Sequence, residues 1–188
     1  MAGLAPAPQP IGIFPQFLAA GPETLVLKEK VMSLTGDSFS IKLANGTPVL
    51  KVEGKVMSIS GRKKMFDMND NHLCSIVKEH FHLHSTYVVE GADGQKIMEV
   101  KSSFKPIFTS ANGKQESLVM RGDFFDTQAD IIDEAQNNLV VARIDRKLLS
   151  GKDIFFGQQT YGVQIAPGVD MALIAALCIC LDEKNNEG

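Results

Sequence analysis

Apolar and polar residues alternate along most of this chain, in short runs separated by tight turns. A period of two places neighbouring side chains on opposite faces of a strand, so the pattern predicts β-structure from residue 24 to residue 165. The expected strands cover residues 24–31, 38–43, 48–52, 63–68, 73–78, 85–90, 96–102, 105–109, 116–121, 130–133, 139–145 and 160–165. Because short turns join most of these strands in chain order, the sequence predicts an antiparallel meander.

The turns themselves carry a second signal. Asn45-Gly46 is the strongest, because both central positions of a two-residue type I′ turn need a positive φ. Similar turns follow at Asn69 and Asp93, evenly spaced along the chain. A strand–turn–strand unit that repeats at a fixed spacing is typical of sequential hairpins.

One segment breaks the strand pattern. Residues 171–181, MALIAALCICL, are all apolar, and their Ala and Leu content favours a helix. Asp170 precedes them and is expected to cap the first turn. A helix that is apolar on every face is buried on all sides or lies in a membrane. At a length of about 17 Å this helix is too short for a hydrocarbon core of roughly 30 Å, so we expect it inside the protein.

Together these elements predict a mainly β protein, a closed antiparallel barrel of about twelve strands around one buried apolar C-terminal α-helix. Closure removes the free edges of the sheet, and the helix fills the interior. We expect a proline-rich N-terminal arm at residues 1–22 and a single barrel domain at residues 23–188. The prolines favour an extended or polyproline-like arm that either packs loosely on the domain or is free.

Composition excludes several classes of protein. A length of 188 residues suits one domain, and 44% hydrophobic with 22% charged residues is ordinary globular usage. A net charge of −3 provides no basic field to hold nucleic acid. Three cysteines and no signal-peptide pattern predict a cytoplasmic protein, at most peripheral at membranes, with no transmembrane span.

Four stretches occur in a distinctive order: residues 30–34 (KVMSL), 44–46 (ANG) with 49–52 (VLKV), 142–147 (ARIDRK), and 167–170 (PGVD) leading into the helix. In this order they resemble the LURP-one-related family, whose domain belongs to the tubby C-terminal-like barrels. The resemblance runs from about residue 25 to residue 183. It implies a closed twelve-stranded barrel around the helix. It also implies two groups of distant relatives, the tubby proteins, which bind phosphoinositide lipids, and the phospholipid scramblases.

The sequence therefore predicts a non-catalytic binding module without a cofactor, whose partner is an anionic lipid headgroup or another protein. It contains no G-x-S-x-G, H-E-x-x-H, C-x-x-C or phosphate-loop motif. The densest basic spots are the candidate lipid ligands: Arg62, Lys63, Lys64, Arg146 and Lys147. Their charges suit phosphate groups, although ordinary solvated surface charges would give the same pattern.

Two other functions stay open at this point. His80, His82 and His84 share one face of an extended strand and could hold zinc in a metal-dependent enzyme, although a solvated strand face is the simpler interpretation, so no metal is assigned. The likeness to scramblases gives a membrane-associated alternative in which residues 171–181 form an anchor. Cys178 and Cys180 lie in that segment and are expected to be small buried residues.

Overall fold

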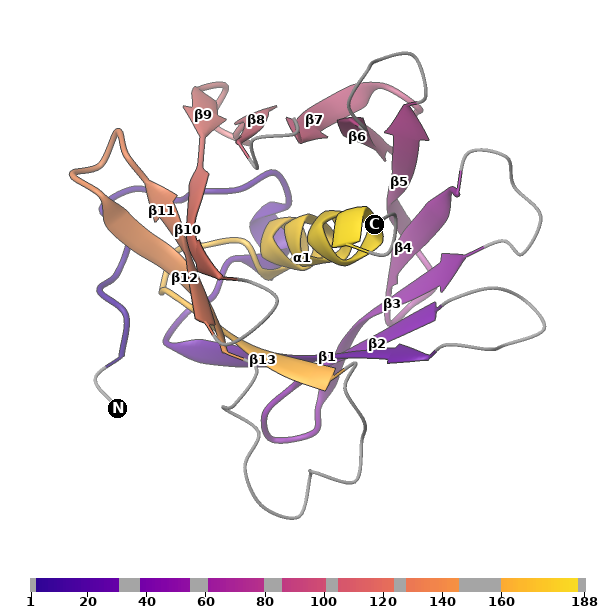
Figure 1. Cartoon of the computed structure of the whole chain (residues 1–188), viewed down its shortest axis with the longest axis horizontal. Helices are drawn as coiled ribbons and strands as arrows, with labels where there is room; N and C mark the ends of the chain where they lie inside the picture. Colours follow the sequence, from indigo (N-terminus) through magenta and orange to yellow (C-terminus); the bar gives the residue numbers. More distant parts are fainter. Residues whose placement is uncertain are drawn as a thin grey trace.

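The computed structural model describes residues 3–30, 38–54, 61–79, 86–100, 105–123, 128–145 and 160–185. In these residues, thirteen antiparallel strands form one sheet, which curls into a nearly closed barrel around a single α-helix (Figure 1). The predicted fold class, a mainly β barrel around a buried C-terminal helix, is confirmed.

A short 3₁₀-helix, η1 (Pro15–Phe17), precedes the sheet, and the helix α1 (Met171–Asn185) follows it. The strands are β1 (Glu23–Lys30), β2 (Ser38–Leu43), β3 (Pro48–Gly54), β4 (Lys63–Asp67), β5 (His72–Glu79), β6 (Thr86–Gly91), β7 (Lys96–Val100), β8 (Pro106–Thr109), β9 (Gln115–Ser117), β10 (Val119–Asp123), β11 (Gln128–Asp133), β12 (Leu139–Asp145) and β13 (Thr160–Ile165). The largest difference from the prediction is at residues 116–121, where one expected strand is divided between β9 and β10.

This division closes the barrel. The sheet order runs from β10 through β11, β12, β13 and β1, and then in chain order to β9. β9 and β10 are successive pieces of one chain segment, interrupted at Leu118. β9 pairs with β8, whereas β10 pairs with β11. A single bent segment therefore links the two ends of the sheet, and counting it as one strand gives the twelve that the sequence predicts.

The turns use residues that tolerate a positive φ, but the first hairpin differs from the prediction. At Asn45-Gly46 only Gly46 has a positive φ, 89°, so the expected type I′ turn is wrong; the Asn45 side chain instead accepts a hydrogen bond of 2.9 Å from the Thr47 N–H. Asn137 and Asn138, between β11 and β12, both have positive φ values, 57° and 58°. Asn tolerates this left-handed region better than most residues, which explains its use in a tight hairpin.

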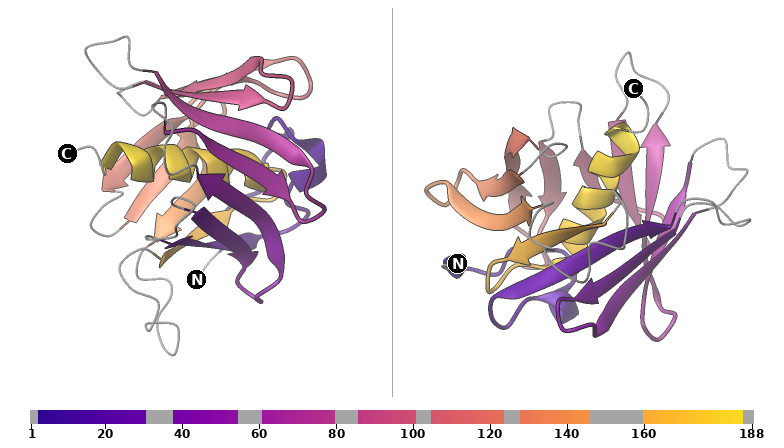
Figure 2. Two further views of the ribbon diagram at one scale, coloured as in Figure 1. Left: turned by 90° about the vertical axis from the view of Figure 1, so that its right-hand side faces the viewer. Right: turned by 60° about the horizontal axis from the view of Figure 1, so that its bottom comes forward.

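The helix α1 fills the barrel interior. Every side chain from Ala172 to Asp182 is buried, although consecutive residues point in all directions around the helix. Figure 2 shows why: the strands lie around α1 on its different sides, so none of its faces needs to be polar. The helix continues to Asn185, beyond the predicted end at residue 181.

The N-terminal arm closes the end of the barrel where α1 begins (Figure 2). Ile11 is completely buried, its N–H donates to the Gly168 carbonyl at 3.0 Å, and its own carbonyl accepts from the Asp170 N–H at 2.9 Å. The Ala19 N–H donates to the Val169 carbonyl at 2.9 Å. The sequence predicted loose packing, but these main-chain bonds attach the arm to the segment that enters the helix.

Asp170 joins the arm to the helix. Its Oδ1 accepts hydrogen bonds from the N–H groups of Ala172 (2.8 Å) and Leu173 (3.2 Å), which confirms the predicted cap. Its Oδ2 accepts from Ile13 (2.9 Å) and Phe14 (2.7 Å) in the arm. Burial raises the pKa of this carboxyl to about 6, while the four N–H donors act in the opposite direction.

Substituting Gly12 tests this junction. A Cβ at Gly12 would lie 2.1 Å from the Cβ of Asp170, so Gly12→Ala must displace the arm. We expect a loss of roughly 1–3 kcal/mol in the free energy of unfolding and faster proteolysis within the arm. Gly21→Ala is the matched control, because no atom lies within 4 Å of its added Cβ. Equal melting temperatures for the two variants would contradict the tight junction.

Truncating a helix side chain tests the filled barrel. Ile174 is completely buried, so Ile174→Ala should lower the free energy of unfolding by about 2–5 kcal/mol through lost burial and a new cavity. Met68, in the turn between β4 and β5, is 47% exposed, and Met68→Ala should change stability by less than about 0.5 kcal/mol. Urea denaturation followed by circular dichroism measures both values. A small effect at Ile174 would show that the helix is not the core.

Candidate functional site

Lys63, one of the predicted lipid ligands, points into the barrel. It opens β4 on the same face as the buried Met65, and its side chain is only 5% exposed. Its Nζ lies 2.6 Å from Oε1 of Glu183, in the last turn of α1, and 5.0 Å from the ring centroid of Phe39. The charge of Lys63 is therefore compensated inside the protein, by an anion and an aromatic face.

Arg62 and Lys64 are more accessible. The Arg62 guanidinium donates to Oε2 of Glu90 at 2.6 Å, and about a third of its side chain (35%) is exposed. Lys64 is half-buried on the opposite face of β4 from Lys63, and it pairs in register with Glu53 of β3. The structure thus separates three residues that are adjacent in sequence. A role in lipid binding stays a prediction for Arg62 and Lys64.

The remaining candidate residues are not tested by the structure. His80, His82, His84, Arg146 and Lys147 lie outside the described residues. Within the described ranges, no group of three or more His, Cys, Asp or Glu side chains could hold a metal ion.

All three cysteines are free and buried. Burial raises the pKa of the Cys74 thiol to about 12 and also raises that of Cys180. Since the thiolate is the reactive form, Cys74 and Cys180 have neither the exposure nor the ionisation of a nucleophile.

Two polar contacts attach the last turn of α1 to the barrel wall. The Tyr161 hydroxyl, on β13, donates to Oδ2 of Asp182 at 2.5 Å, and Lys63 on β4 pairs with Glu183. Acidic side chains are unfavourable near the C-terminus of a helix, because they repel the negative end of its dipole. Tyr161 and Lys63 offset this cost. They also favour one position of the helix along the barrel axis and one rotation of the helix about its own axis.

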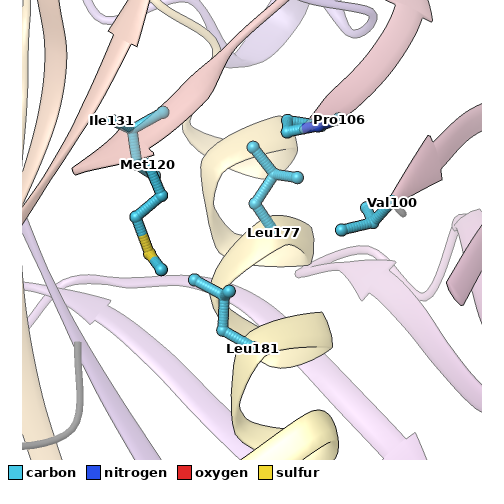
Figure 3. A pocket seen from close by; sticks show the side chains of 6 residues that line it. All are labelled: Val100, Pro106, Met120, Ile131, Leu177 and Leu181. Carbon is cyan, nitrogen blue, oxygen red and sulfur yellow. The ribbon is translucent and has the colours of Figure 1, made fainter. Parts of the chain in front are cut away.

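An apolar notch lies between α1 and strands β7, β8, β10 and β11 (Figure 3). At the end of the β8–β9 pairing, the Leu118 N–H donates to the Pro106 carbonyl at 3.2 Å. From there on, in the described structure, β10 pairs along one edge only, with β11. We call this gap the notch; it is lined by Val100, Pro106, Met120, Ile131, Leu177 and Leu181. Its cavity of about 10 Å³ is close to the volume that one water-sized group needs.

The helix approaches the surface along the notch. Leu177 and Leu181 are 3% and 4% exposed, whereas every other side chain from Ala172 to Cys180 is 1% exposed or less. Residues four apart share one face of a helix, so one face of α1 forms the floor of the notch. Sequence reasoning missed this feature, because it treated residues 116–121 as one strand. Pro106 was the available signal, since proline donates no hydrogen bond and favours a sheet edge.

A family model for the LURP-one-related family matches residues 23–182. The chain belongs to the LURP-one-related family. Among its relatives, LURP-one-related 10 of Arabidopsis thaliana is 26% identical over 189 residues, which cover 93% of this chain and 96% of the relative. LURP-one-related 15 of the same plant is 24% identical over 199 residues, with 97% and 90% covered. Neither of these names denotes an enzymatic activity.

A solved structure shares the fold of this LURP-one-related chain. An X-ray structure of an Arabidopsis thaliana protein aligns with a TM-score of 0.61 at 16% identity, covering 93% of this chain and 98% of the other. At this identity the likeness concerns the fold alone. Among the residues that the structure describes, no helix combines the length and the apolar composition that crossing a membrane requires.

A double-mutant cycle tests the contact between Lys63 and Glu183. Glu183→Gln leaves a buried ammonium without its anion, so we expect a loss of about 2–4 kcal/mol in the free energy of unfolding. Combining it with Lys63→Met should restore most of that loss, because both charges are then absent. Glu134→Gln, in the exposed pair with Arg121, is the control and should cost less than about 1 kcal/mol. Simple additivity of the two substitutions would show that the pair is not coupled.

Proposed function

We propose that this LURP-one-related chain is a non-catalytic binding module that contacts another protein through the outer surface of its barrel. The observation that supports this is the filled interior: α1 occupies the space in which many barrels bind a ligand. Pockets for small molecules usually measure about 300–1,000 Å³. In the described structure, the gap between the helix and the wall has only about 10 Å³. A partner must therefore bind on the outside.

The charges favour a protein over an anionic membrane. The chain has a net charge of −3, and two of the three described candidate lipid ligands, Arg62 and Lys63, are paired with acidic residues. Attraction to an anionic membrane usually needs a cluster of about four to eight basic residues, each worth about 1 kcal/mol. An anionic lipid headgroup remains the second candidate, because Arg62 and Lys64 are partly exposed. The three free thiols suit a reducing, cytoplasmic location.

Vesicle sedimentation separates the two partners. At ~0.1 M salt, where screening is moderate, we expect equal amounts of protein to sediment with vesicles that contain or lack phosphoinositide. The test variant combines Arg62→Ala with Lys64→Ala, and the control is Arg121→Ala on β10, which is remote from β4 in the sheet order. Sedimentation that depends on phosphoinositide and is lost only in the Arg62 and Lys64 variant would replace the protein partner with a lipid headgroup.

A further inference from the structure

We propose that Asn112-Gly113, in the turn between β8 and β9, is a site of spontaneous deamidation, and that the N-terminal arm controls the reaction by holding this turn closed. The side-chain amide of Asn112 is converted to a carboxylate without an enzyme, and solvent water is the only co-reactant. This modification is independent of the partner binding proposed above.

The reaction needs an asparagine followed by a residue whose backbone nitrogen is unhindered. The Gly113 nitrogen loses its proton to solvent base and attacks Cγ of Asn112, and ammonia leaves as a succinimide ring closes. Water then opens the ring at either of its carbonyl groups, so the product is aspartate or isoaspartate. Glycine favours the attack, because it has no Cβ to obstruct the nitrogen and its backbone is permissive. Both residues of the pair are exposed to solvent.

The closed turn prevents this attack. The Gly113 N–H donates to the Ser110 carbonyl at 2.8 Å, so its proton is not accessible to base. Oδ1 of Asn112 accepts from the Lys114 N–H at 2.9 Å, which fixes the side-chain amide. The reaction therefore proceeds in molecules whose turn has opened. Because opening is fast compared with deamidation, the rate follows the fraction of open turns.

A second turn has the same Ala-Asn-Gly tripeptide, at residues 44–46 between β2 and β3. The Gly46 N–H donates to the Leu43 carbonyl at 2.9 Å, and Oδ1 of Asn45 accepts from the Thr47 N–H at 2.9 Å. The two glycines also have similar φ values, 89° and 81°. Since the contacts within the two turns are alike, this turn is an internal reference for the one between β8 and β9.

The two turns differ in what holds the alanine before the asparagine. The Ala44 N–H donates at 2.8 Å to the carbonyl of Thr24, which belongs to β1. The Ala111 N–H donates instead to the Gly12 carbonyl in the arm at 2.9 Å, and the Gly12 N–H donates to Oγ of the buried Ser110 at 3.3 Å. Detaching the arm therefore removes two hydrogen bonds from the turn between β8 and β9 and leaves the bond of Ala44 intact.

The isoaspartate product keeps the turn from closing again. Isoaspartate adds one carbon to the main chain between Ala111 and Gly113, so the turn no longer matches the hydrogen bond from the Ser110 N–H to the Lys114 carbonyl, which is 2.8 Å long in the closed form. The arm then loses its partners in this turn. Deamidation thus makes a reversible detachment of the arm permanent.

The test is peptide mapping by mass spectrometry after the full-length chain has been incubated at mildly alkaline pH. Gly12→Ala displaces the arm, because the added Cβ would lie 2.1 Å from the Cβ of Asp170. We expect deamidation at Asn112 to become about fivefold faster or more, as the loss of two hydrogen bonds predicts, while Asn45 keeps its wild-type rate. Gly21→Ala is the matched control, since no atom lies within 4 Å of its added Cβ, and it should change neither rate.

Asn45 also shows whether Gly12→Ala has unfolded as a whole, since both sites would then react faster. In that case Ser110→Ala decides, because it removes only the hydroxyl that accepts from the Gly12 N–H. Deamidation at Asn112 alone should then rise by about twofold or more. If Asn112 reacts no faster in either variant than in the wild type, or if Ser110→Ala accelerates both sites equally, the inference is wrong. The vesicle experiment tests the proposed partner separately from these rates.

Discussion

An apolar helix that must be kept from water on every side is the constraint on which this fold depends. Amphipathic helices cover one face of a sheet, but α1 has no face to leave in solvent, so the sheet has to surround it. Thirteen strands in one layer can do this only if the two ends of the layer are joined. The bend at Leu118 joins them, since it lets one segment pair with β8 and then with β11. The notch lies next to this bend, between α1 and β10.

Apolar packing alone would leave the position of the helix poorly defined, because a uniformly apolar cylinder can rotate or slide with little change in burial. Polar contacts at its two ends remove that freedom. Asp170 connects the first turn to the arm, while Lys63 and Tyr161 hold the last turn to two different strands. Buried polar groups of this kind often contribute more to the uniqueness of a structure than to its stability. In this barrel the polar contacts of α1 described above lie near its first and last turns, at the two open ends of the barrel.

The sequence predicted the architecture because the relevant signals are local. Strand alternation, the Asn45-Gly46 turn and the apolar run at residues 171–181 can each be read from a few neighbouring residues. The site was harder to predict. Arg62, Lys63 and Lys64 look like one basic patch, but strand geometry sends Lys63 inward, and its partner Glu183 is distant in sequence. The notch depends on which strands pair with β9 and β10. The alternation of apolar and polar residues along the chain does not reveal that pairing.

The position of β1 has a consequence for how the chain reaches this structure. β1 lies between β2 and β13, so one of its edges is completed early in synthesis and the other only after residue 165 has been made. The helix that fills the interior is made later still. Until then the inward side chains of a dozen strands have nothing to pack against, and their folding must wait for contacts between distant parts of the chain. Such topologies fold slowly and expose apolar surface while they do so. A nascent LURP-one-related chain therefore exposes apolar surface until its last strand and its helix have been made.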